Sequence, residues 1–137
     1  FEALAITNKI PISGLETATD QIAIFDHLSK KQQTEMVMES IRNPEKIMQQ
    51  TREMEQLYVD QNIDSMYMMI LHQESVIVDE QATFLDDRNS RWIPLIIQHI
   101  KSHSTFIAVG AGHLGGPNGV VRLLQGKGYT LTPIRIK

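Results

Sequence analysis

Apolar residues recur at helical spacing along most of this chain, and the pattern predicts a largely helical protein. One predicted helix follows Asn43, and its repeating face consists of Ile47, Thr51, Met54 and Tyr58, with polar residues between them. Residues 64–71 are rich in Met and apolar on more than one side, which is typical of a more buried helix. Residues 92–100 predict a further helix, just before the segment from Thr105 to Ile136.

Three start signals support this assignment of helices. Two are capping-box patterns, and the third is an N-cap residue followed by a first-turn proline: Thr17 with Asp20, Ser29 with Gln32, and Asn43 with Pro44.

Three short segments rich in branched residues predict strands instead: the segments near Ile10 to Glu16, Phe106 to Val109 and Tyr129 to Ile136. The range from Asn118 to Gln125 predicts a helix between the last two, so these form a parallel, right-handed βαβ unit. The predicted fold is therefore an α-rich α/β fold, with helices packed on a small sheet. Residues 1–137 contain no repeat or linker and are expected to form a single domain or domain fragment.

Composition narrows the possible functions. The formal charge of -3 gives no electrostatic basis for binding nucleic acid, and the absence of cysteine excludes disulfides and thiolate metal sites. No apolar run approaches the roughly 20 residues that span a bilayer. The chain opens at Phe1 within what reads as a secondary-structure element, so we interpret it as a fragment, and a missing targeting segment carries little meaning.

A glycine-dense turn follows the strand predicted at Phe106 to Val109. Gly110, Gly112 and Gly115 match the dinucleotide-binding fingerprint in its required context, between a strand and a helix. Against this, the last strand ends in Arg135 and Lys137, where an NAD site has an acidic residue, and only one βαβ unit fits. The alternative is a tight turn that needs glycine for backbone reasons.

His113 lies in that turn, at the predicted carboxyl end of a strand, where α/β folds bind ligands. A neutral imidazole there can bind a metal or transfer protons. Glu16 ends another predicted strand just before a helix. Its alternative role is to stabilise the N-terminus of that helix.

Arg88 and Asn89 precede Trp92 and form the third candidate. Arg88 can act as an anion clamp. The simpler interpretation is a helix start, with Trp92 in the core and with caps at Asp86, Asp87 and Asn89. His99 and His103 have the spacing of zinc peptidase motifs, but Ile100 stands where those motifs place the general-base glutamate. The simpler interpretation is that His99 and His103 are partly exposed histidines on a helix. His27 and His72 lie in no motif, and no function is predicted for them.

Several segments together resemble one family. They are Gly14-Leu15-Glu16-Thr17 followed by Asp20-Gln21, Arg88-Asn89 with Trp92, the block from Phe106 to Leu114, Gly119-Val120, Leu123-Leu124, Gly128-Tyr129-Thr130 and Pro133-Ile134. In this order they resemble the C-terminal portion of the TraB/GumN family, bacterial relatives of the Tiki-type metallopeptidases. The resemblance covers almost the whole chain.

The resemblance implies a metal-dependent, peptidase-like hydrolase. Carried over, the family glutamate is Glu16, the arginine is Arg88 with Asn89 beside it, and the late glycine–histidine motif supplies His113. The metal ligands are then His113 and Glu16, for Mn, Co or Zn in the intact protein. The family's early glycine–histidine motif has no counterpart here, so this fragment is expected to be inactive and to bind no metal tightly.

The resemblance also implies a periplasmic or cell-envelope location and an unidentified peptide or small-molecule substrate. The alternative is a non-catalytic module that binds a ligand or peptide in the cell envelope. In either case we expect Glu16, Arg88 and His113 to face one cleft at the carboxyl edge of the sheet. His113 should point into that cleft, so that its replacement by Ala costs under about 1 kcal/mol of stability, and Gly112 should need a positive φ. The sequence does not determine the oligomeric state.

Overall fold

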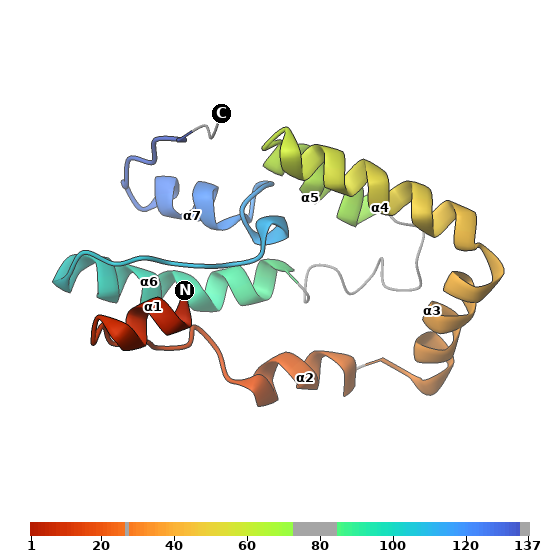
Figure 1. Cartoon of the computed structure of the whole chain (residues 1–137), viewed down its shortest axis with the longest axis horizontal. Coiled ribbons are helices and arrows are strands. Elements are labelled where there is room, and N and C mark those ends of the chain that lie inside the picture. The colour runs from red at the N-terminus through yellow and green to blue at the C-terminus, as the bar shows by residue number, and fades with distance from the viewer. Residues whose placement is uncertain (27, 73–84, 135–137) are drawn as a thin grey trace.

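The protein is described by a computed structural model in which residues 1–26, 28–72 and 85–134 are placed (Figure 1). Its elements in these ranges are helices α1 (Glu2–Thr7), α2 (Ala18–Asp26), α3 (Lys30–Arg42), α4 (Pro44–Val59), α5 (Ile63–His72), α6 (Asp87–Ser102), the 3-10 turn η3 (Ala111–His113) and α7 (Val120–Gly126).

The predicted helix starts are confirmed. In the first capping box the Thr17 amide donates to Asp20 Oδ2 at 2.9 Å, and the Asp20 amide donates back to Thr17 Oγ1 at 3.1 Å. Ser29 begins α3 through the same reciprocal arrangement with Gln32. Pro44 occupies the first turn of α4, but the Asn43 side chain makes no capping hydrogen bond. Local hydrogen bonding therefore decides where α2 and α3 begin, because it satisfies amides that the helix itself leaves free.

The predicted α/β fold is wrong, because the described residues contain no strand and no sheet. The segments at residues 10–16, 106–109 and 129–134 are irregular and share no backbone ladder, and Ile136 lies outside the described residues. The βαβ unit is absent for the same reason. Branched residues favour an extended backbone, but a sheet also requires a neighbouring backbone about 4.8 Å away. Here the side chains of Ile107, Val109 and Leu131 pack on helices instead.

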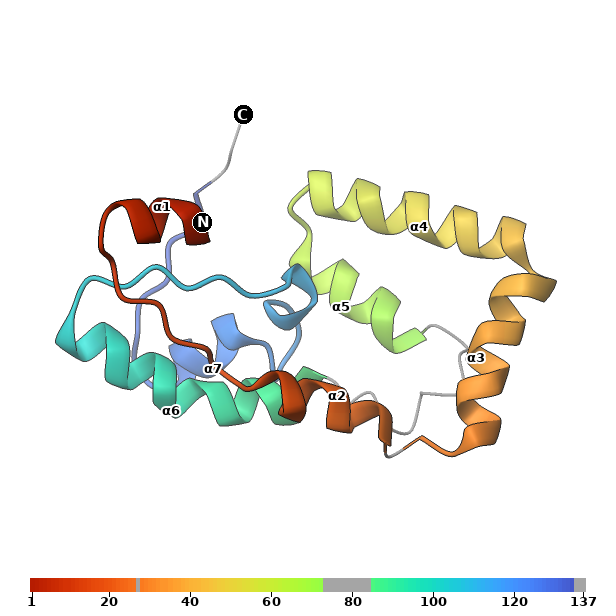
Figure 2. The ribbon, with the colours of Figure 1, turned by 60° about the horizontal axis from the view of Figure 1, so that its bottom comes forward.

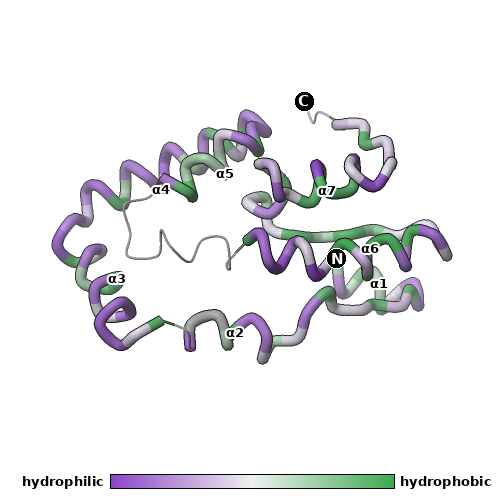
Figure 3. Tube along the Cα trace, turned by 180° about the vertical axis from the view of Figure 1, so that it is seen from behind, coloured by the Kyte–Doolittle hydropathy of each residue, from purple (hydrophilic) through white to green (hydrophobic). Residues whose placement is uncertain are grey.

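The hydrophobic core lies between α6 and α7. Its buried members are Trp92, Ile93 and Ile96 from α6 and Val120 and Leu124 from α7. The unpaired segment after α6 runs back along that helix (Figure 1) and adds partly buried residues to the same core. Figure 3 shows apolar residues concentrated along this segment, α6 and α7, with α3 and α4 more hydrophilic. The buried face of α6 is therefore covered by α7 and by this segment.

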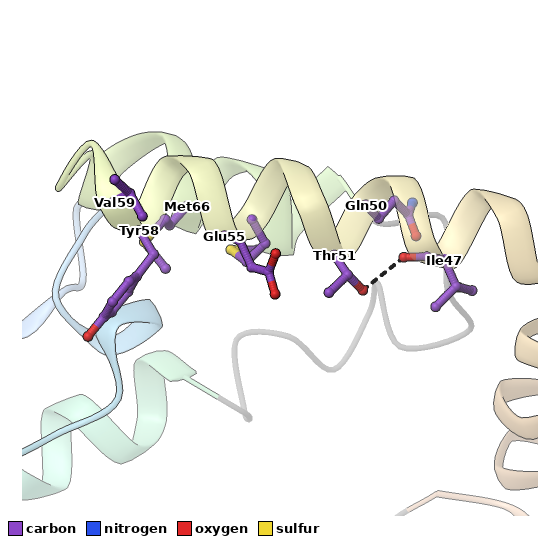
Figure 4. Close-up of a pocket in the computed structure, with 8 residues that line it drawn as sticks. Ile47, Gln50, Thr51, Glu55, Tyr58, Val59 and Met66 are labelled. Carbon is purple, nitrogen blue, oxygen red and sulfur yellow. Dashed lines mark hydrogen bonds between the residues drawn. The ribbon is translucent and has the colours of Figure 1, made fainter.

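Helices α2 and α3 lead away from this core, and α4 returns alongside α5 (Figure 2). The Met-rich helix predicted to be more buried is α5, whose Met66 and Tyr67 are buried, and this prediction is confirmed. The repeating face of α4 instead lines a cavity of about 710 Å³ beside Met66 (Figure 4), with Tyr58 still 64% exposed. None of the helices in the described ranges has the length and apolar character needed to cross a membrane.

Candidate functional site

The first turns of α6 bring the candidate residues together. Trp92 lies four positions after Arg88 and three after Asn89. Residues at this spacing are neighbours on a helix surface, so both side chains lie next to Trp92. The segment before α2 supplies Glu16 to this region, and η3 supplies His113. Residues that are far apart in sequence thus meet at the start of one helix.

Arg88 and Glu16 form a two-pronged ion pair. Arg88 Nε donates to Glu16 Oε2 at 3.0 Å, and Nη2 donates to Oε1. The side chains are only 12% and 17% exposed, so the pair is screened less by solvent than a surface pair. The guanidinium carbon also lies 5.0 Å from the centroid of the Trp92 ring, within cation–π range. Glu16, which stands just before the start of α2, thus makes a long-range contact with α6.

His113 is buried against Trp92. Its ring centroid lies 4.5 Å from that of Trp92, with the planes tilted by 45°, and only 7% of the residue is exposed. The pKa of His113 is lowered to about 4, chiefly by burial and also by the positive charge of Arg88, while the negative charge of Glu16 partly opposes the shift. At neutral pH the imidazole is therefore uncharged.

Asn89 links His113 to the loop that follows it. Asn89 Oδ1 lies 2.8 Å from His113 Nδ1, and Asn89 Nδ2 donates to the backbone oxygens of His113 at 3.3 Å and Asn118 at 2.9 Å. Asn118 Nδ2 in turn donates to Asp86 Oδ2 at 2.8 Å. Asn89 is 1% exposed and lies inside α6, so it is no helix cap, whereas Asp86 does occupy the N-cap position. Its polar atoms organise the loop that carries His113.

The glycines of this loop are needed for close packing. A Cβ on Gly115 would lie 2.1 Å from the Ile63 oxygen, and one on Gly116, whose φ is +78°, would overlap Tyr67. Gly112 does not have the positive φ that the sequence analysis expected, so that prediction is wrong. A Cβ at this position would instead meet the Ile70 side chain at 2.8 Å. The dinucleotide interpretation also fails, because no strand precedes Gly110 in the described residues and α7 begins only at Val120.

The other histidines stay apart from this cluster. His103 lies beyond the end of α6 with an extended backbone, so it does not share a helix face with His99. His99 Nε2 lies 3.3 Å from Ser13 Oγ in an exposed contact, and His72 is exposed. His27 is outside the described residues.

Glu16, Arg88, Asn89 and His113 thus gather around Trp92, although not at the edge of a sheet, because there is none. His113 is buried against Trp92 and does not point into an open cleft. We therefore expect its replacement by Ala to cost more than the sequence alone suggested, because it leaves Asn89 Oδ1 unpaired and empties space beside Trp92. The sequence held one overlooked signal. Asn89 precedes Trp92, Ile93 and Ile96 at helical spacing on the buried face, where a polar residue requires dedicated partners.

A sequence model described as the TraB/PrgY/gumN family matches residues 1–133, nearly the whole chain. The chain belongs to this family. No curated protein and no solved structure matches it. The TraB/PrgY/gumN match includes all four clustered residues, so the family assignment and the geometry concern the same part of the chain.

We expect a double-mutant cycle to show that the Arg88–Glu16 pair is coupled by about 1–2 kcal/mol. The pair is two-pronged and mostly buried, and such pairs exceed the value of exposed ones. Denaturant unfolding of Arg88→Met, Glu16→Gln and the double variant gives the coupling energy.

The Arg42–Glu35 pair provides a matched control. Its atoms approach to 3.1 Å, but its side chains are 55% and 42% exposed. The same cycle there should give no more than about 0.5 kcal/mol. Equal coupling in the two cycles would mean that burial adds nothing at Glu16.

Proposed function

We propose that this chain supplies part of a metal-assisted hydrolytic site in which His113 binds a divalent cation. The observation that carries the proposal is the buried imidazole of His113, uncharged at neutral pH and next to a carboxylate–guanidinium pair. An uncharged imidazole has a lone pair for a cation, whereas an imidazolium has none. A cation bound there would polarise a carbonyl group and activate water.

The residues fit such a cation in part. His113 fits as a ligand because it needs no deprotonation at neutral pH. Glu16 fits less well, since both of its carboxylate oxygens already accept hydrogen bonds from Arg88. No group of three or more His, Asp or Glu side chains within residues 1–26, 28–72 and 85–134 is arranged to hold a metal. The ligand set formed by this part of the chain is therefore incomplete.

Arg88 and Glu16 have separate roles in this proposal. The guanidinium places positive charge next to His113, where it would stabilise the negative charge that develops on an attacked carbonyl oxygen. Glu16 would accept a proton from water once a substrate or cation draws it away from Arg88. Both groups are held by largely buried contacts, so opening the pair between them is the rearrangement that this role requires.

A chelation assay tests the function. Peptide hydrolysis by the full-length protein should stop with EDTA and return with Mn²⁺, Co²⁺ or Zn²⁺. His113→Gln should lower the restored rate by roughly 100-fold or more. Hydrolysis that persists with EDTA, or is unchanged in the variant, would contradict the assignment.

For the 137-residue chain alone we expect weak metal binding and no turnover. Catalytic zinc sites normally use three protein ligands, and among the residues that the structure describes our candidates are His113 and Glu16, whose two carboxylate oxygens already accept from Arg88. Calorimetry with Mn²⁺, Co²⁺ and Zn²⁺ measures this. A submicromolar one-to-one site would show that the ligand set extends to other histidines, such as His99.

The second candidate is a non-catalytic module that binds a peptide or other ligand. The closed Arg88–Glu16 pair favours it, because the two charges satisfy each other without any ligand. Failure of all three metals to support hydrolysis, with retained peptide binding, would select this alternative. For either function we propose a periplasmic or cell-envelope location, which fractionation of the native cells tests.

A further inference from the structure

Asn89 is the most buried polar residue of the cluster, and its hydrogen bonds determine more than the shape of the loop. Its amide cannot be turned around. Nδ2 faces two backbone oxygens, those of His113 and Asn118, which only a donor can satisfy. If the amide were reversed, its oxygen would face these two oxygens, and repulsion would replace both bonds.

The orientation of the amide determines which atom faces the histidine. Asn89 Oδ1 lies 2.8 Å from His113 Nδ1. An amide oxygen can only accept, so the proton of this bond must reside on Nδ1. An uncharged imidazole has one N–H, and the other ring nitrogen, Nε2, then has the lone pair. Nε2 has no hydrogen-bond partner within the described ranges.

We propose that Asn89 is a positioning residue that holds His113 as the Nδ1–H tautomer, so that Nε2 is presented as the lone-pair donor of the site. This deepens the function proposed above and relies on it for its role in the reaction. Metal-binding histidines commonly donate their second ring N–H to an oxygen of the protein, which orients the ring and increases its basicity. Asn89 supplies that oxygen, and because it is 1% exposed it does not itself reach a substrate.

The assignment opposes the intrinsic preference of histidine. In water the Nε2–H tautomer is the more populated form of an uncharged imidazole. The structure therefore predicts the less common tautomer, held by a bond that one substitution removes. A residue that only supported the loop would not affect which ring nitrogen holds the proton.

The test is ¹⁵N NMR of the histidine rings in the 137-residue chain at pH 7.5. Protonated and unprotonated ring nitrogens have well-separated chemical shifts. In the wild-type chain His113 Nδ1 should appear protonated and Nε2 unprotonated. In Asn89→Leu the acceptor is lost, and the Nε2–H form should become the major one.

Two further variants separate positioning from support of the loop. Asn89→Asp keeps an oxygen facing Nδ1 but loses both bonds to the backbone oxygens, so it should destabilise the loop and still keep the proton on Nδ1. Asn118→Ala removes the side-chain bond to Asp86 in the same loop and leaves the Asn89 contacts in place. It should not change the tautomer.

An Nε2–H tautomer in the wild-type chain would overturn the inference, as would an unchanged tautomer in Asn89→Leu. If Asn89→Leu does not fold, the wild-type spectrum and Asn89→Asp decide: loss of the Nδ1 proton in either contradicts the assignment. The result is independent of catalysis. An Nδ1–H tautomer without metal-dependent hydrolysis would defeat the proposed function and leave the tautomer assignment intact.

Discussion

Gly115→Ala is expected to destabilise the protein by more than about 3 kcal/mol. One added methyl group would lie 2.1 Å from the oxygen and 2.5 Å from the carbonyl carbon of Ile63, at the start of α5. These are backbone atoms, so no side-chain rotation relieves the overlap, and the loop must separate from α5. Domains of this size are stable by only about 5–15 kcal/mol, so the substitution should remove a substantial part of the free energy of unfolding.

Two other glycines provide a graded comparison for the same substitution. At Gly112 the added Cβ would meet the Ile70 side chain at 2.8 Å, and the end of that side chain can move, so we expect a cost of about 1 kcal/mol. Gly126 ends α7 with nothing within 4 Å, and Ala there should leave stability unchanged or raise it by up to about 1 kcal/mol. Denaturant unfolding of the three variants measures the series. Similar values at Gly115 and Gly126 would show that α5 and the loop do not pack as closely as described.

The second large effect is a loss of stability in mild acid. Burial next to Arg88 lowers the pKa of His113 from 6.5 to about 4 in the folded protein. Between these values the unfolded chain binds a proton that the folded chain does not. The free energy of unfolding therefore rises with pH across this window and reaches its full value above pH 6.5.

The size of the effect follows from the same two pKa values. Between pH 7.5 and pH 5, His113 alone should remove about 2 kcal/mol from the free energy of unfolding, and the full difference is roughly 3 kcal/mol. His113→Gln keeps a donor for Asn89 Oδ1 but does not titrate, so its stability should change less over this range. The difference between the two pH profiles isolates His113 from the carboxyl groups.

An NMR titration of the wild-type chain gives the same information without any variant. The His113 ring signals should not move between pH 7.5 and pH 5.5. A midpoint close to 6.5 would show that the ring is solvated and that its packing against Trp92 is looser than described.

Features that depend on neighbouring residues could be predicted without the structure. The start signals at Thr17 and Ser29 predicted where two helices begin, because a capping box involves only residues three positions apart. Helical spacing likewise predicted α4, α5 and α6, and Trp92 as a core residue. The family was also recognisable from the sequence, since its motifs are local strings in a fixed order.

Features that depend on contacts between distant segments could not be predicted in this way. The segments that contain Ile107 and Leu131 pack on α6 and α7 and do not pair as strands. Their sequences could not predict this, because strand pairing depends on a second segment and not on the residues of one segment alone. The sequence identified Glu16 and His113 as candidates but not the ion pair with Arg88 or the stacking on Trp92. The uncharged state of His113 was equally hidden. It results from burial and from the charge of Arg88, and both exist only once the start of α6, the segment before α2 and the η3 turn have come together.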